Sequence, residues 1–152
     1  MISFIGRHLV SVDDKGRISI PSKFRGSSED KKKLKFILTP GLDGCIALYP
    51  ASTWKEIDNK RRGKMEGLSF TKRDFRFFDR RFYASADDVS PDNQGRIRIP
   101  GFLLEDSKIT KEALVIGVGD RIELWSPEEY RSYIEGFGET VEQVAERLYS
   151  RD

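Results

Sequence analysis

Two short segments of the chain carry an aspartate and an arginine at the same spacing, with a glycine directly before the arginine. The first segment has Asp13 and Arg17, and the second has Asp92 and Arg96. A carboxylate and a guanidinium that flank one turn pair easily, and the pair fixes the direction of the arginine. Arginine has five N–H donors in a rigid fork, so several stay available for a ligand. This favours nucleic-acid recognition, because arginine reads the O6 and N7 atoms of guanine and the major groove admits a β-ribbon.

The same spacing also has a purely structural interpretation. The aspartate and arginine could simply staple a turn that the glycine shapes, and an exposed ion pair contributes only ~1 kcal/mol or less. From the bare spacing, both interpretations stay open. Two copies of the pattern, each continuing as Ile-x-Ile-Pro, are much more specific than one.

The two segments belong to an internal duplication. Aligning Gly16 with Gly95 places Val10–Pro21 over Val89–Pro100, with eight identities in twelve positions. The similarity resumes further on, where "DGCIALYPASTW" lies over "GDRIELWSPEEY". The two copies differ slightly in length, and the polar segment "GSSEDKKK" is a loop that absorbs the difference easily.

Each copy is expected to be mostly β. The residues on either side of Asp13–Gly16 alternate between apolar and polar, which predicts a hairpin closed by Gly16 at positive φ. Pro21 ends the strand, and Ser22 is expected to cap a short helical turn. A second strand pair follows in each copy: "LKFILT" with "CIALY", then "EALVIG" with "RIELW".

Helices are predicted between and after the copies. In "TKRDFRFFDRRF", Phe75, Phe78 and Phe82 share one helical face. "SPEEYRSYIEG" begins like a helix, with Ser126 as its cap and glutamate at the capping-box position.

The C-terminal segment "TVEQVAERLYS" also has a helix signature. Thr140 is the expected cap, with Gln143 three residues later. Five residues form an apolar stripe: Val141, Val144, Ala145, Leu148 and Tyr149. We expect the domain itself to bury this stripe, and a neighbouring subunit is the alternative.

The overall composition neither requires nor excludes a nucleic-acid partner, because the 27 basic and 25 acidic residues nearly balance. Cys45 is the only cysteine, which excludes an intrachain disulfide and fits a reducing cytoplasm, and we expect it to be buried. The N-terminus does not resemble a signal peptide, and no apolar run approaches the roughly 20 residues of a membrane helix. We therefore expect a soluble cytoplasmic protein.

An enzyme is the main competing class, and the sequence gives it little support. "GVGDR" resembles a phosphate loop, but it lacks a P-loop lysine and a following helix. His8, the only histidine, is expected to pack on a strand, and no cluster has metal-ligand spacing. We predict no enzymatic activity, no cofactor, no metal and no small-molecule substrate. The remaining basic residues are interpreted as solvated surface: Lys31–Lys33, Lys72, Arg73, Arg76, Arg80 and Arg81.

The whole pattern resembles the MraZ family of bacterial transcriptional regulators, which consist of two SpoVT-AbrB-like copies. The matching segments are "GRHLVSVDDKGRISIP", "GLDGCIALYP", "FYASADDVSPDNQGRIRIP" and "LVIGVGDRIELWSPEEY", and "VAERL" fits the usual C-terminal helix. The resemblance implies an α+β, mainly β fold: a pseudo-symmetric swapped-hairpin β-barrel with flanking helices. On this basis we divide the chain into repeat 1 (6–55), a helical connection (56–83), repeat 2 (84–130) and a C-terminal helix (131–152).

The resemblance also implies a function. It predicts a nucleoid-associated DNA-binding regulator, a repressor, that forms ring-like homo-oligomers. Its partner would be double-stranded DNA at G-rich direct repeats ahead of the division and cell-wall gene cluster. Carried over by position, the DNA-binding residues are Asp13, Lys15, Gly16 and Arg17 in the first copy, and Asp92, Gly95 and Arg96 in the second.

Two of the differences between the aligned copies bear on DNA contact. Gln94 replaces the lysine found at Lys15, and Pro91 replaces Val12, which removes a backbone donor and suits an edge strand. We therefore expect the first copy to dominate DNA contact. The alternative function is a ring-forming scaffold that reads no DNA sequence.

Overall fold

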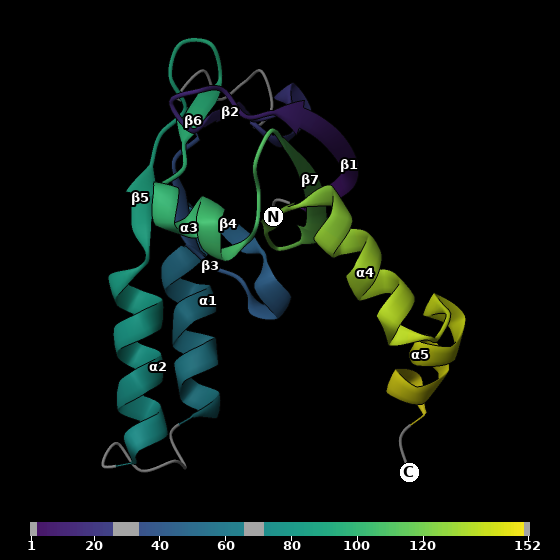
Figure 1. Ribbon diagram of the computed structural model, residues 1–152. Helices are drawn as coiled ribbons and strands as arrows, with labels where there is room; N and C mark the ends of the chain where they lie inside the picture. The colour runs from purple at the N-terminus through teal and green to yellow at the C-terminus, as the bar shows by residue number, and fades with distance from the viewer. Residues whose placement is uncertain (1–2, 26–33, 66–71, 151–152) are drawn as a thin grey trace.

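The computed structural model describes residues 3–25, 34–65 and 72–150, which form a six-stranded antiparallel sheet, a two-stranded ribbon and flanking helices (Figure 1). The strand order of the sheet is β1-β7-β8-β4-β3-β5, and the ribbon pairs β2 with β6. The first repeat supplies β1 (Phe4–Ser11), β2 (Arg17–Ser19), β3 (Phe36–Pro40) and β4 (Ile46–Pro50). The second supplies β5 (Asp87–Val89), β6 (Arg96–Arg98), β7 (Glu112–Gly119) and β8 (Ile122–Trp125).

The two repeats exchange their first strands. β1 of the first repeat pairs with β7 of the second, and β5 of the second pairs with β3 of the first. β4 and β8 meet at the centre of the sheet. Interchanging the repeats therefore leaves the strand order unchanged, which is the pseudo-twofold symmetry expected of a duplication. The predicted pairs β3–β4 and β7–β8 are confirmed.

Two expectations about the first strands of each repeat are wrong. β1 and β2 do not form a hairpin, because β1 pairs with β7 while β2 pairs with β6. The sheet is also not a closed barrel: in the described part of the chain, β1 and β5 are the edges of an open sheet. The ribbon is a separate two-stranded sheet, and neither β2 nor β6 pairs with these edges. As expected, Pro91 follows an edge strand, β5.

One apolar core holds both repeats together. The ribbon contributes Ile18 and Ile97, which are 1% and 2% exposed and lie opposite each other. The two central strands contribute Leu48 and Leu124, both fully buried. These side chains belong to a single cluster, so the two repeats share one core.

A short helix follows each strand of the ribbon. These are η1 (Ser22–Phe24) in the first repeat and α3 (Gly101–Asp106) in the second, and each buries the side chain of its third residue in the core. The predicted helical turn after Pro21 is confirmed. The predicted cap is wrong, because the helix begins after Pro21 and has no side-chain cap.

The helical connection contains two helices, α1 (Ala51–Lys64) and α2 (Arg73–Ala84), which lie side by side (Figure 1). The aromatic face of α2 is as predicted: Phe75 and Phe82 are buried, and Phe78 stacks on Phe82 with the ring centroids 5.1 Å apart. The predicted solvated basic residues of this region are exposed: Lys72, Arg73, Arg76, Arg80 and Arg81. The loop at 26–33, with Lys31–Lys33, lies outside the described residues.

The α+β class is confirmed, but the expectation of a mainly β chain is wrong. In the described residues the α-helices hold more of the chain than the strands do. The longest helix, α1, has no buried residue, and most of it lies within the predicted helical connection (56–83).

Two helices end the described chain, α4 (Pro127–Phe137) and α5 (Val141–Tyr149). Ser126 caps α4 by accepting a hydrogen bond from the backbone N–H of Glu129, at 3.3 Å. Thr140 and Gln143 form a complete capping box at the start of α5. Both predicted helix starts are confirmed.

The apolar stripe of α5 is exposed, so the expectation that the domain buries it is wrong. Val141 is 88% exposed, Leu148 71% and Tyr149 86%. The reason is the direction of α4, which carries α5 away from the sheet (Figure 1). The stripe instead lines an apolar groove of about 440 Å³, to which α4 contributes Tyr133, Ile134 and Phe137.

Candidate nucleic-acid interface

The first turn is built around the carboxylate of Asp13. Its Oδ1 atom accepts hydrogen bonds from the backbone N–H groups of Lys15 and Arg17, at 2.9 and 2.8 Å. Its Oδ2 atom accepts from the Nε–H of Arg17 at 2.8 Å. Gly16 has φ of 74°, a conformation that glycine adopts without strain. The turn and the direction of the arginine are therefore set by one carboxylate.

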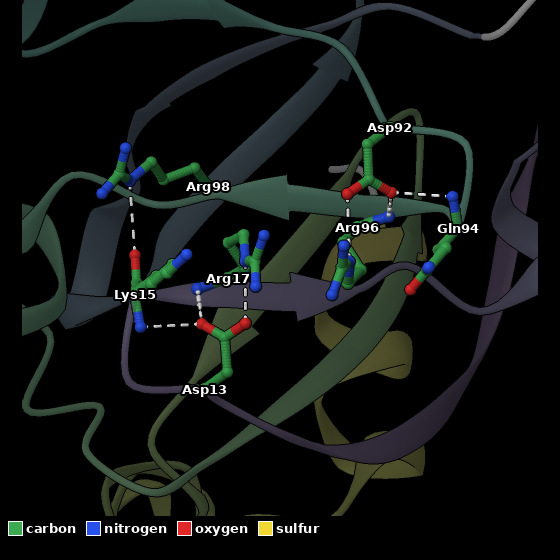
Figure 2. Close-up of polar contacts among 7 residues, drawn as sticks. All are labelled: Asp13, Lys15, Arg17, Asp92, Gln94, Arg96 and Arg98. Atoms are coloured by element: carbon green, nitrogen blue, oxygen red, sulfur yellow. Dashed lines mark hydrogen bonds and ion pairs between the residues drawn. The ribbon is translucent and has the colours of Figure 1, made fainter.

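The second turn repeats this geometry. Oδ1 of Asp92 accepts from the backbone N–H groups of Gln94 and Arg96, at 2.8 and 3.0 Å, and Oδ2 accepts from the Nε–H of Arg96 at 3.0 Å. Gly95 has φ of 73°. Figure 2 shows the two turns at opposite ends of the ribbon. In both pairs the bond uses Nε–H, so the four Nη hydrogens of each arginine stay outside the pair.

Both aspartates are stabilised in their charged form. The pKa of Asp13 is lowered from 3.8 to about 2, and the largest cause is the hydrogen bond from the backbone N–H of Arg17. The Arg17 side chain and the backbone N–H of Lys15 lower the pKa further, whereas desolvation raises it. The pKa of Asp92 is also lowered, chiefly by the backbone N–H of Arg96. Both carboxylates are therefore ionised at neutral pH and hold their arginines.

Asp13→Asn is expected to remove part of the acid sensitivity of the fold. A carboxyl group whose pKa is lower in the folded chain stabilises the fold above its unfolded pKa, and this contribution is lost as the pH falls. For Asp13 this stabilisation is lost as the pH falls from 3.8 to about 2. Urea midpoints measured across this interval should therefore fall more steeply in the parent chain than in Asp13→Asn. The exposed neighbour variant Asp14→Asn is the control, and parallel curves for the parent and Asp13→Asn would contradict the role of this carboxylate.

The outer face of the ribbon carries arginines from both repeats. The register pairs Arg17 with Arg98, and Ser19 with Arg96. These four side chains share one face, because residues along a strand alternate and the isoleucines between them are buried on the other face. The ribbon therefore has two different faces. Its apolar face packs into the core, and its cationic face points outward.

The backbone joins each turn to the opposite repeat. The carbonyl of Gly16 accepts a hydrogen bond from the N–H of Ile99 at 2.9 Å, and the carbonyl of Gly95 accepts from Ile20 at 2.9 Å. The position of one turn therefore depends on the strand of the other copy, and neither repeat completes the interface alone.

The structure brings the seven predicted residues together at the two ends of this one ribbon: Asp13, Lys15, Gly16, Arg17, Asp92, Gly95 and Arg96. Arg98 lies on the same face, and its partner belongs to the other repeat. The Nε–H of Arg98 donates to the carbonyl of Lys15 at 3.3 Å, across 83 positions of the chain. Local spacing carries no signal for such a contact, whereas the pairing of β2 with β6 does.

The residues that an enzyme would need are engaged in structural contacts. The ring of His8 packs edge-to-face against Phe24, with centroids 5.8 Å apart. "GVGDR" ends β7 and forms the short turn into β8, and Arg121 in it pairs with Glu123 at 3.1 Å. Cys45 is buried, as predicted, and burial raises the pKa of its thiol to about 12. A thiol with this pKa stays protonated and is a poor nucleophile.

The described part of the chain has neither a metal-binding cluster nor a membrane-spanning helix. In residues 3–25, 34–65 and 72–150, no group of three or more His, Cys, Asp or Glu side chains is arranged to hold a metal ion. No helix within these ranges is both long and apolar enough to cross a membrane.

Fold and site together define a class: a two-repeat α+β protein with an aspartate-held arginine turn at each end of a ribbon shared by the repeats. A family model described as "MraZ protein, putative antitoxin-like" matches residues 3–81 and again 82–152. The chain belongs to the MraZ family.

Several relatives resemble the chain over nearly its full length. Transcriptional regulator MraZ of Carboxydothermus hydrogenoformans is 39% identical over 145 residues, covering 95% of this chain and 96% of the relative. The protein of the same name from Alkaliphilus metalliredigens is 41% identical over 145 residues, with the same coverage. That from Moorella thermoacetica is 38% identical over 149 residues, covering 98% of this chain and 99% of the relative.

Proposed function

We propose that this chain is a transcriptional regulator that binds double-stranded DNA through the arginine turns of its ribbon. The observation that carries the proposal is the geometry of the two pairs. Arg17 and Arg96 are each held by an ionised aspartate on the outer face, with Nη hydrogens outside the pair. The relatives are named transcriptional regulator MraZ, and this name supports the same proposal.

Each of the seven site residues has a role in this proposal. Arg17 and Arg96 read guanine bidentately, which suits a G-rich site. Asp13 and Asp92 position these arginines, and the two glycines adopt the positive φ that closes each turn. Lys15 contacts phosphate as a mobile point charge. The ribbon enters the major groove as a two-stranded element.

The proposed target is a set of G-rich tandem repeats upstream of the gene's own operon, the division and cell-wall cluster, where the protein acts as a repressor in association with the nucleoid. The family resemblance supports this target. Tandem sites also fit the small number of cations at the site of one copy, which are Lys15, Arg17 and Arg96. Several copies on repeated sites convert weak contacts into avidity, and counterion release adds up over the copies.

The multiple copies are proposed to form a ring-like homo-oligomer in which a second copy covers the groove between α4 and α5. Val141, Leu148 and Tyr149 are large apolar side chains that lie exposed in or beside this groove. Burying them against another copy removes apolar surface from water. A self-association surface on the projecting α4–α5 pair leaves the ribbon free for DNA (Figure 1).

Leu148→Asp is expected to break this assembly. Burying a neutral polar group without a partner costs roughly 2–7 kcal/mol, and an ionised carboxylate costs more. The particle mass measured by light scattering should therefore fall towards the 17.5 kDa of one chain. Leu42→Asp is the matched control, because Leu42 is 74% exposed and lies outside the groove. If the mass of Leu148→Asp equals that of the parent chain, a second copy does not cover the groove.

Footprinting of the purified protein on the DNA upstream of its own gene tests the proposed function. We expect protection of regularly spaced G-rich repeats, and an affinity that falls steeply with added salt. Equal affinity for random duplex would refute sequence-specific regulation and favour a ring-forming scaffold. A shallow salt dependence would contradict engagement of several copies.

A further inference from the structure

Arg98 of the second repeat lies at the first turn. It is directly opposite Arg17 in the ribbon, and its Nε–H donates to the carbonyl of Lys15 at 3.3 Å (Figure 2). Three cationic side chains from two repeats therefore gather at this end of the ribbon. Arg98 forms no ion pair with any described carboxylate, in contrast to Arg17, which pairs with Asp13.

Arg25 of the first repeat lies at the second turn. A Cβ atom built on Gly95 would lie 2.5 Å from Nη1 and 2.6 Å from Cζ of Arg25, so the guanidinium covers the glycine where a side chain would project. Gly95 is buried, although it lies in a surface turn. Arg25 itself is exposed and has no ion pair with the described carboxylates. This contact joins segments about 70 residues apart.

The pseudo-twofold symmetry shows that the two arginines are not equivalent. Leu104 occupies the place at Gly16 that Arg25 occupies at Gly95, since the Leu104 Cδ1 atom lies 3.4 Å from a Cβ built on Gly16. In the ribbon, Ser19 stands opposite Arg96, as Arg98 stands opposite Arg17. Each turn therefore has one arginine from the opposite repeat. Arg98 comes from a strand of the ribbon, and Arg25 comes from the end of η1.

The two routes give the turns the same formal charge. At the first turn, three cations (Lys15, Arg17, Arg98) face two carboxylates (Asp13, Asp14), which leaves +1. At the second, two cations (Arg25, Arg96) face one carboxylate (Asp92), which also leaves +1. The expectation that the first copy dominates depended on Gln94 in place of Lys15 and on Pro91 in place of Val12, and Arg25 supplies the charge that Gln94 lacks.

Placing these arginines here disfavours folding. Like charges directly opposite in a ribbon repel, and Arg98 faces Arg17 across the register. The hydrogen bond from Arg98 to the carbonyl of Lys15 does not remove this repulsion, and a local arrangement that opposes stability is typical of a functional site. The ligand that offsets the repulsion is an anion that spans the end of the ribbon.

We propose that each DNA-binding turn is a composite site, completed by Arg98 at the first turn and by Arg25 at the second, and that both arginines contact DNA phosphate. This inference rests on the proposed function. It extends the site from seven residues to nine and assigns DNA contact to both repeats.

The test measures affinity for the upstream DNA at several salt concentrations. Arg25→Ala and Arg98→Ala should each lower affinity about threefold to tenfold, and lower the salt slope by about one for each turn engaged. Arg80→Ala removes the same charge from an exposed position on α2 and should change neither quantity. Arg25→Lys and Arg98→Lys should keep the parent slope, because phosphate contact requires only the charge. Ala and Lys variants with the same slope would overturn the inference.

A charge relocation at the second turn gives a sharper test. In Arg25→Ala, adding Gln94→Lys restores a cation to the same turn, at the position equivalent to Lys15. Recovery of affinity and slope supports the composite site, and no recovery overturns it for this turn. If the parent chain itself fails to bind the upstream DNA, the proposed function fails. If the parent binds, Arg17→Ala does not, and the Arg25 and Arg98 variants match Arg80→Ala, only this inference fails.

Discussion

Arg17→Ala is expected to lower the affinity for the upstream DNA by at least about 100-fold, because a bidentate contact with guanine contributes about 1–3 kcal/mol and each copy in the oligomer loses it. The fold should survive the change. The side chain of Arg17 lies on the outer face of the ribbon, and its pair with Asp13 is exposed enough to contribute only ~1 kcal/mol or less. The measurement is a titration of labelled duplex, with particle mass and thermal unfolding recorded on the same samples.

Two further variants make this result specific. Arg80→Ala controls for the loss of one positive charge and should bind like the parent chain, since Arg80 lies on the exposed face of α2. Arg17→Lys keeps the charge but loses the rigid fork, and should recover non-specific affinity without the preference for G-rich repeats. Unchanged affinity in Arg17→Ala would show that the Asp–Arg pair only staples the turn.

Ile18→Ala is expected to have the largest effect on stability among the ribbon residues. Ile18 is 1% exposed and lies opposite Ile97 in the shared core. Removing a buried isoleucine side chain costs about 2–5 kcal/mol, through lost burial and the cavity left behind. Because a typical domain is stable by only about 5–15 kcal/mol, this one change should lower the urea midpoint substantially. DNA binding should weaken as well, since the ribbon is the site's support.

Ser19→Ala is the matched control for stability. Ser19 is the next residue along the same strand, but it lies on the exposed face, where substitutions usually change stability by about 0.5 kcal/mol or less. Both variants must be compared at one chain concentration, because self-association adds to apparent stability. Equal midpoints for the two variants would mean that the ribbon does not unite the repeats into one folding unit.

The contacts within each turn could be predicted from the sequence, but the contacts between the two repeats could not. The Asp13–Arg17 pair could be predicted because a four-residue spacing around a glycine leaves few geometries for a carboxylate and a guanidinium. The position of Arg98 at Lys15, and of Arg25 at Gly95, depends on which strands pair and in which register. Neither property is encoded in residues that are neighbours in the chain.

The fold shows the same division between local and long-range structure. The strand pairs β3–β4 and β7–β8 were predicted, because each is joined by a short turn between two apolar runs. The pairing of β1 with β2 was predicted by the same rule and is wrong. The alternation of apolar and polar residues does not indicate whether β2 pairs with a strand of its own repeat or with β6 of the other repeat. Burial of the isoleucines on both β2 and β6 makes that choice in favour of the exchange.

The amino-acid sequence was enough to establish the duplication, because its residues recur in the same order. It was also enough for the two aspartate-held arginine turns and the capped starts of α4 and α5, because each is set by side chains within about four positions of one another. Only the tertiary structure decided that the repeats exchange strands, that the sheet stays open, and that the stripe of α5 is exposed. These features depend on which surfaces the whole chain buries together, and no short segment contains that information.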